Sequence, residues 1–183
     1  ELVHAATLLH DDVLDEGETR RGISTARKVF GNSASILGGD HLLVTALQRV
    51  QRGGTPELLE GLLNTISSMV HAEAIQLDRR GRFEPDANSY DTVVKGKTAE
   101  LFRWSMRSGA TLGGLNKDQV EKLALFGHNL GMAFQNADDI LDFQGSAEEA
   151  GKPVGNDLSQ GVLTLPAIIA IERNPEDNPV ITL

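Results

Sequence analysis

Residues 11–15 read Asp-Asp-Val-Leu-Asp, and residues 138–142 read Asp-Asp-Ile-Leu-Asp. We refer to these stretches as the first and second pentads. An α-helix has 3.6 residues per turn, so residues at positions i and i+4 lie on the same helix face. If both pentads are helical, the first and last aspartates of each one form a carboxylate pair. These pairs are Asp11 with Asp15 and Asp138 with Asp142.

Each carboxylate pair needs a nearby positive charge. Like charges at this spacing destabilise a helix by about 0.2–0.5 kcal/mol per pair, and a bound cation is the simplest compensation. Ligation by oxygen alone favours Mg²⁺, with Mn²⁺ as the alternative, and Mg²⁺ takes further ligands from water and substrate phosphates. One pentad alone is typical of a solvated helix face, but two copies flanked by apolar residues predict a metal site. Its predicted ligands are Asp11, Asp12, Asp15, Asp138, Asp139 and Asp142.

Other polar side chains near the pentads suit phosphate binding. Arg and Lys donate charge-assisted hydrogen bonds to phosphate oxygens. A glutamine three residues before the second pentad lies on nearly the same helix face and can donate in the same way. Taken singly, each of these side chains is typical of a protein surface. The candidates for substrate binding are Arg20, Arg21, Lys97, Thr98, Gln135 and Lys152.

The composition excludes several other classes of site. The formal net charge of −9 argues against a nucleic-acid surface, because phosphate backbones recruit clusters of Lys and Arg. The 183 residues contain no cysteine, so disulfides, thiolate catalysis and zinc ribbons are excluded. This fits a reducing compartment, and we expect the cytoplasm. No apolar run approaches the roughly 20 residues of a membrane-spanning helix, so we expect no transmembrane segment.

Apolar residues recur at helical spacing along most of the chain, and no segment alternates like a strand. A chain of this length with 40% hydrophobic residues can form one core, so we expect a single domain over residues 1–183. Residues 16–33 are predicted to form a loop, and Thr55 and Asn116 are suited to cap the helices that follow them. The pattern predicts an all-α bundle around a central cavity. The predicted helices are residues 1–15, 34–50, 58–77, 90–112, 120–143 and 165–171.

The first residues already lie within a helical pattern. The chain opens at Glu1 without a methionine. We therefore expect an N-terminal portion before Glu1, and any targeting segment would lie there.

The order of these motifs resembles the trans-isoprenyl diphosphate synthase family, also called polyprenyl diphosphate synthases. The likeness covers almost the whole chain, which resembles a central fragment of the family's catalytic domain. Each motif alone could arise by chance, but the ordered set is highly specific. It comprises residues 9–15, Arg20-Arg21-Gly22, Gly39-Asp40, Lys97-Thr98-Ala99-Glu100-Leu101-Phe102, Gln135 with residues 138–142, Gly151-Lys152 and Asp157-Leu158.

The resemblance implies an isoprenoid-synthase-type bundle in which the two pentads face each other across a deep central cavity. It implies a prenyltransferase that condenses an allylic diphosphate with isopentenyl diphosphate. Mg²⁺ and basic side chains draw negative charge onto the leaving diphosphate, so that an allylic carbocation forms. The departing diphosphate accepts the proton that is lost after the new bond forms. The family likeness also implies a homodimer, with part of the isopentenyl diphosphate site before Glu1.

The resemblance assigns a role to each candidate residue. The six aspartates of the pentads hold Mg²⁺, and together with Lys97 and Thr98 they are the catalytic residues. Arg21 belongs to the isopentenyl diphosphate site, and the region of Thr98 and the Lys97 carbonyl steadies the carbocation. The residues that contact the allylic diphosphate are Arg20, Lys97, Gln135 and Lys152.

The resemblance also implies that product length depends on the residues one turn before Asp11, which are Ala6 and Thr7. Relatives with short products block this level with Phe or Tyr, and this sequence does not. These residues would form the floor of the cavity that holds the growing chain, and each helical turn farther from the pentad deepens that cavity by about 5.4 Å. Because no bulky residue blocks the floor here, we predict a product longer than about twenty carbons. Residues 73–76, Glu-Ala-Ile-Gln, also resemble a variant found in long-chain synthases. Shorter-chain farnesyl and geranylgeranyl diphosphate synthases are the alternatives.

Three further alternatives are less consistent with the sequence. A class I terpene cyclase normally has a second motif of Asn/Asp, Ser/Thr and Glu, whereas here the aspartate pattern repeats. A non-catalytic regulatory subunit is expected to lose the aspartates, and all six are present. A phosphohydrolase with a His10-Asp11 metal site needs further histidine ligands. The candidates for these are His4, His41 and His71.

One departure from the family pattern lies near the C-terminal end. Many relatives carry Glu-Gly-Lys where this chain has Gln160-Gly161-Val162. We interpret this as a subfamily difference, because Lys152 retains the phosphate role.

Overall fold

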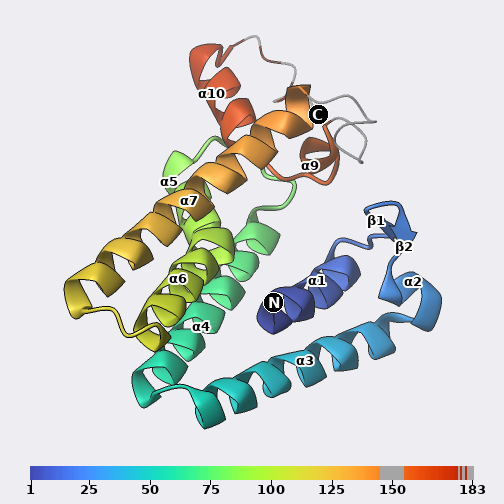
Figure 1. Cartoon of the computed structure of the whole chain (residues 1–183). Coiled ribbons are helices and arrows are strands. Elements are labelled where there is room, and N and C mark those ends of the chain that lie inside the picture. Colours follow the sequence, from blue (N-terminus) through green and yellow to red (C-terminus); the bar gives the residue numbers. More distant parts are fainter. Residues whose placement is uncertain (145–154, 177, 179, 181–183) are drawn as a thin grey trace. The chain divides into compact units, whose positions relative to one another are not determined.

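The computed structural model describes residues 1–144, 155–176, 178 and 180. Among these residues almost all regular structure is helical, which confirms the predicted all-α class (Figure 1). The chain divides into two compact units, Glu1–Glu60 and Gly61–Leu183, which we call the N-terminal and C-terminal units. None of the described helices is both long and apolar enough to cross a membrane.

The N-terminal unit is built on two helices, α1 (Leu2–Leu14) and α3 (Asn32–Gly53). The Ser35 hydroxyl donates to the Leu9 carbonyl oxygen at 2.8 Å. A side chain at Gly39 would place its Cβ 3.0 Å from the Ala6 carbonyl oxygen and against the His10 ring. Glycine at position 39 is therefore what allows α3 to approach α1 this closely.

The connection between α1 and α3 is more ordered than the predicted loop over residues 16–33. A two-stranded hairpin of β1 (Thr19–Arg20) and β2 (Ile23–Ser24) is followed by the short helix α2 (Ala26–Phe30). The turn residues Arg21 and Gly22 both have positive φ, 52° and 76°, as a tight two-residue hairpin turn requires. Strands of two residues are too short to show alternation, so the sequence pattern missed them.

The C-terminal unit contains most of α4 (Pro56–Arg79), which begins in the N-terminal unit. A nearly continuous helical stretch follows, made of α5 (Ala87–Val94), η1 (Lys95–Ala99) and α6 (Glu100–Leu112). The sequence predicted one helix over residues 90–112, whereas η1 is a turn of π-helix.

The long helix α7 (Lys117–Gln144) packs along α6 (Figure 1). Gly127 faces α6, where a Cβ would lie 2.7 Å from the Phe102 carbonyl oxygen. The start of α7 is capped as predicted, because Asn116 Oδ1 accepts a hydrogen bond from the Gln119 backbone N–H at 3.0 Å. In turn, Gln119 Oε1 accepts a hydrogen bond from the Asn116 backbone N–H. The predicted cap at Thr55 is also confirmed, by a 3.4 Å bond from the Leu58 N–H.

Among the residues that the structure describes after α7, two shorter helices follow in the C-terminal unit. They are α9 (Asn156–Ser159) and α10 (Leu165–Arg173). Helix α10 contacts α5 and α7 and buries Ala167, Ile168 and Ile171. It lies near the C-terminal end of α7, the end that carries residues 138–142 (Figure 1).

Candidate functional site

The first pentad lies at the C-terminal end of α1. Asp11 and Asp12 belong to the helix, and Asp15 is its C-terminal cap. The Asp15 N–H donates to the Asp11 carbonyl oxygen at 2.8 Å, so the helical spacing of this pair is kept. Asp12 is buried, with 6% of its surface exposed, while Asp11 and Asp15 are partly exposed.

Arg20 is the partner of the buried aspartate in the first pentad. Its Nε and Nη2 atoms donate to Asp12 Oδ1 at 3.0 and 2.9 Å. Arg20 therefore stands beside the first pentad, as a phosphate-binding residue would, with part of its charge already matched. Arg21, the other predicted binding residue, is exposed at the tip of the hairpin.

The predicted product-length residues lie on α1 of the same unit. Ala6 is buried, with 1% of its surface exposed, and Thr7 is partly buried. The Thr7 hydroxyl donates to the His4 carbonyl oxygen at 2.9 Å. His10, considered above as a metal ligand, has its Nε2 atom 3.2 Å from both the Ile36 carbonyl oxygen and Asp40 Oδ1. Its described contacts are therefore with α3.

The second pentad lies in the last two turns of α7, and its three aspartates differ in environment. Asp138 is exposed, Asp139 is buried with 2% of its surface exposed, and Asp142 is intermediate. Gln135 Nε2 donates to Asp139 Oδ1 at 2.8 Å, and the Tyr90 hydroxyl lies 2.5 Å from Asp139 Oδ2. Burial raises the pKa of Asp139, while these two hydrogen bonds act in the opposite direction.

Tyr90 is a site residue that the sequence did not reveal. It lies on α5, and its hydroxyl is also 2.8 Å from Asn136 Oδ1. Burial and the nearby Asp139 carboxylate raise the pKa of the Tyr90 hydroxyl, so it is protonated at neutral pH. A single tyrosine at the beginning of a helical pattern gives no sequence signal for a partner 49 residues away.

Asp142 binds the backbone that follows the second pentad. Its two carboxylate oxygens accept from the N–H groups of Asn156 and Asp157, at 3.2 and 3.1 Å. Its carbonyl oxygen accepts from the Gly155 N–H at 2.8 Å. Asp142 thus ties the first residues of α9 to the end of α7.

Lys97 and Thr98 lie on η1, where two helices come close to the backbone. A Cβ at Gly96 would lie 2.8 Å from the Ser68 carbonyl oxygen on α4, and a Cβ at Gly131 on α7 would lie 2.6 Å from Ala99 Cα. A π-turn between such close neighbours widens the helix locally, and turns of this kind are frequent at functional sites.

The two predicted residues of η1 point to different partners. Lys97 Nζ lies 2.8 Å from Glu73 Oε2 and 3.5 Å from Gln76 Oε1 on α4. The Thr98 hydroxyl donates to Gln135 Oε1 at 2.9 Å. A connected series of hydrogen bonds therefore runs from Thr98 through Gln135 to Asp139.

The two units thus divide the predicted site residues between them. The N-terminal unit joins Asp12 with Arg20, and the C-terminal unit joins Thr98, Gln135 and Asp139. Lys152 lies outside the described residues. Within the part of the chain that the structure describes, no three His, Asp or Glu side chains converge closely enough to hold a metal ion by themselves.

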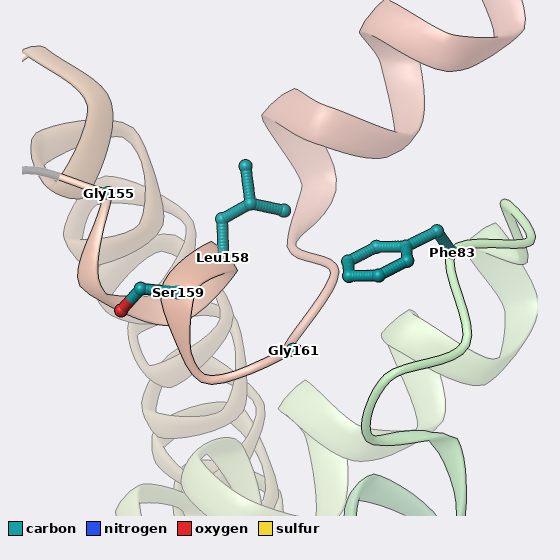
Figure 2. A pocket seen from close by; sticks show the side chains of 5 residues that line it. All are labelled: Phe83, Gly155, Leu158, Ser159 and Gly161. Atoms are coloured by element: carbon teal, nitrogen blue, oxygen red, sulfur yellow. The ribbon is translucent and has the colours of Figure 1, made fainter. Parts of the chain in front are cut away.

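A small pocket of about 450 Å³ lies beside α9 in the C-terminal unit. Figure 2 shows the ring of Phe83 and the side chain of Leu158 facing it from separate segments. Gly161 also lines it, with φ of 74°, and its carbonyl oxygen accepts from the Gly81 N–H at 2.9 Å. The departure at residues 160–162 therefore lies at a structural contact between two loops.

Comparison with known proteins gives a consistent result. The family model described as polyprenyl synthetase matches residues 1–182. Component 2 of heptaprenyl diphosphate synthase from Geobacillus stearothermophilus is 39% identical over 93% of this chain and 53% of its own length. Octaprenyl diphosphate synthase from Escherichia coli is 37% identical over 99% of this chain and 56% of its own length.

Solved structures agree with these relatives. The crystal structure of heptaprenyl diphosphate synthase from Staphylococcus aureus superimposes with a TM-score of 0.91 and 34% identity. That match covers 96% of this chain and 55% of the other. The chain spans about half the length of the relatives it matches.

Proposed function

Because the chain belongs to the polyprenyl synthetase family, we propose that it is the central part of a prenyltransferase that makes long-chain polyprenyl diphosphates. The substrates are an allylic diphosphate and isopentenyl diphosphate. One observation carries this proposal: hydrogen bonds join Thr98 of one motif with Gln135 and Asp139 of another. Such a polar array beside an acidic pentad suits a diphosphate and its cations better than it suits a packed core.

The residues in this proposal act as follows. Lys97, Gln135 and Arg20 donate to the allylic diphosphate and draw charge from its C–O bond, which breaks with its electron pair going to the diphosphate. The region of Thr98 and the Lys97 carbonyl steadies the carbocation. The double bond of isopentenyl diphosphate forms the new C–C bond, and the released diphosphate accepts the lost proton. Arg21 and Lys152 complete the phosphate contacts.

The pentads fit Mg²⁺, with Mn²⁺ as the alternative, because their donors are all oxygens and lie on helices. In the second pentad, Asp138 is exposed, whereas both oxygens of Asp139 are held by protein donors. We therefore expect Asp138 to carry most of the ligation there. The ion would supply positive charge to the leaving diphosphate. In the first pentad, Asp11 and Asp15 are the more open pair.

The proposed product is longer than about twenty carbons, because neither Ala6 nor Thr7, about one helical turn of 5.4 Å before the first pentad, is the Phe or Tyr that blocks this level in short-product synthases. The relatives support a long product, since two of them are named heptaprenyl and octaprenyl diphosphate synthases. The family model spans both units, which supports one catalytic domain over residues 1–183.

The proposed assembly is a homodimer. A specific observation favours testing a heteromer as well, because the Geobacillus stearothermophilus relative is named component 2 of its synthase. Two measurements on the purified full-length protein separate these assemblies. A homodimer has twice the mass of the chain by light scattering and is active alone, whereas a heteromer needs a second polypeptide for activity.

The proposed compartment is the cytoplasm. The lack of cysteine in these 183 residues supports a reducing compartment. Relatives from Neurospora crassa and Arabidopsis thaliana are named mitochondrial and chloroplastic. Cell fractionation followed by detection of the full-length protein separates these compartments.

The test of function is a product ladder. The full-length protein is incubated with Mg²⁺, farnesyl diphosphate and labelled isopentenyl diphosphate, and the dephosphorylated products are separated by length. We expect a metal-dependent ladder that ends above about twenty carbons, and loss of the ladder in Asp11→Ala and Asp138→Ala. The matched control is Asp118→Ala, which changes an exposed aspartate at the other end of α7.

A ladder that stops at fifteen or twenty carbons keeps the enzyme class and overturns the proposed length. Full activity in Asp138→Ala would overturn the role of the second pentad. No elongation by the wild-type protein, with or without a partner chain, would overturn the proposed function.

A further inference from the structure

The carboxyl group of Asp139 is held on both sides by side chains from two helices. Gln135, one turn earlier on α7, donates to Oδ1, and Tyr90 on α5 contacts Oδ2 at 2.5 Å. The residue is 2% exposed, and a buried carboxylate without such partners is strongly unfavourable. Both oxygens are therefore engaged by protein donors, in contrast to the exposed Asp138 one residue earlier.

The Tyr90 hydroxyl has one proton and two neighbours, Asp139 and Asn136. A carboxylate is the stronger acceptor, so Tyr90 donates to Asp139. Asn136 Oδ1 lies 2.8 Å from the same hydroxyl oxygen, as a second and weaker acceptor. The hydrogen bonds from Tyr90 and from Gln135 thus both run toward Asp139, and Gln135 in turn accepts from Thr98.

This direction fixes the Gln135 amide. Its nitrogen donates to Asp139 and its oxygen accepts from Thr98, so the amide has one orientation that satisfies both neighbours. If Asp139 turned away, that constraint on Gln135 would be lost. Tyr90 is the group from α5 that prevents Asp139 from turning.

We propose that Tyr90 is a positioning residue, which holds Asp139 and thereby sets the orientation of Gln135 and Thr98 at the allylic diphosphate. This inference rests on the proposed function, because it assigns Gln135 and Thr98 to that substrate. Tyr90 contacts neither substrate nor cation in this role. Partners that orient the ligands of a metal site typically change affinity or activity by about 10–100-fold when they are removed.

The variant that tests this role is Tyr90→Phe, which keeps the ring and removes the hydroxyl. Its matched control is Thr92→Val on the same helix, because the Thr92 hydroxyl is exposed and donates within α5 to the Asn88 carbonyl oxygen. Both variants are made in the full-length protein. The probe is the thiolo analogue of farnesyl diphosphate, which binds without ionising, and its binding is followed by calorimetry with and without Mg²⁺.

We expect Tyr90→Phe to weaken Mg²⁺-dependent binding of the analogue by roughly tenfold or more. Turnover should fall by a similar factor, while KM for isopentenyl diphosphate stays at the wild-type value, because Arg21, the residue proposed for that substrate, is not part of this network. Thr92→Val should match the wild type in all three measurements. A purely structural role would lower the melting temperature of Tyr90→Phe without changing the binding of the analogue to folded protein.

A second measurement tests the contact without metal. Unfolding of the wild type, Tyr90→Phe, Asp139→Asn and the double variant in a chelator gives the coupling between positions 90 and 139. We expect a clear coupling, and additive effects would overturn the proposed contact. An analogue affinity in Tyr90→Phe equal to that of the wild type would overturn the positioning role alone. A wild type that neither elongates substrate nor binds the analogue would overturn the proposed function.

Discussion

Lys97 Nζ lies 2.8 Å from Glu73 Oε2, so η1 and α4 are joined by an ion pair at the site. The side chains are 29% and 16% exposed, which places this pair between a surface pair and a buried one. Glu73→Gln removes the counter-charge and leaves Lys97 partly desolvated. We expect the free energy of unfolding to fall by about 1–3 kcal/mol, as measured by denaturant titration.

The control for this prediction is Asp118→Asn, which breaks an ion pair with Lys122 whose side chains are 73% and 74% exposed. It should change the free energy of unfolding by less than about 0.5 kcal/mol. Equal effects of the two substitutions would show that burial of the Glu73 pair has no consequence for stability.

The carboxylate of Asp142 supplies acceptors to the first N–H groups of α9. The residue at the N-terminal cap of α9 is Gly155, which has no side chain for this purpose. Asp142→Ala should therefore cost about 0.5–2 kcal/mol, the range for loss of a capping side chain. Amide hydrogen exchange at Asn156 and Asp157 should accelerate in metal-free protein, and Asp142→Asn should retain part of the protection. Unchanged exchange in Asp142→Ala contradicts this account.

Gly161 combines a positive φ of 74° with a close backbone neighbour. A Cβ there would lie 2.8 Å from the Gly81 nitrogen. We expect Gly161→Ala to lower stability by about 1–3 kcal/mol, because the alanine is strained and the two loops must separate. The control is Gly109→Ala on α6, where a Cβ meets nothing within 4 Å. That variant should gain about 0.5–1 kcal/mol, and a loss at Gly109 like that at Gly161 would refute the steric explanation.

Asp139 predicts a pH dependence in metal-free protein. Burial raises its pKa above the ordinary value of 3.8, so the folded state binds a proton at higher pH than the unfolded state. Between the two pKa values, folding takes up a proton, and the stability contributed by this group grows as the pH falls. The unfolding free energy of the wild type minus that of Asp139→Asn should therefore rise from neutral pH downward. It should level off below the unfolded pKa, and a difference that falls on acidification would show that the hydrogen bonds outweigh burial.

Ala6 predicts a change in product length. The side chain is 1% exposed, so phenylalanine at this position must displace its neighbours, at a cost of about 1–3 kcal/mol. Under the proposed function, Ala6→Phe also blocks the path of the growing chain. Product separation should show a shorter ladder, and thermal unfolding should show a lower melting temperature. A destabilised variant with the wild-type ladder would exclude Ala6 from the floor of the site.

Much of the architecture follows from local patterns. The long helices lie where apolar spacing predicted them, and Thr55 and Asn116 cap as expected. The hairpin and η1 were not predicted. The hairpin is too short to show a period. The π-turn lies where α4 comes close to Gly96 and where Gly131 on α7 comes close to Ala99, and these segments are far apart in the sequence.

In the candidate site, too, some features followed from the sequence and others depended on tertiary contacts. The pattern of aspartates, together with Gln135 and Thr98, identified residues that share a network. Their individual partners were not predictable. Tyr90 carried no motif, and nothing local indicated that Glu73 would pair with Lys97.

By itself, the sequence determined the all-α class, the two pentads and the family, because helix periodicity and motif order are properties of neighbouring residues. Tertiary structure decided how the three aspartates of the second pentad differ in environment. Asp138 is exposed, Asp139 is buried and hydrogen-bonded to Tyr90, and Asp142 binds the backbone of α9. The physical reason is that burial and hydrogen-bond partners depend on which helices pack together. Residues separated by tens of positions along the chain set the solvation of each carboxylate.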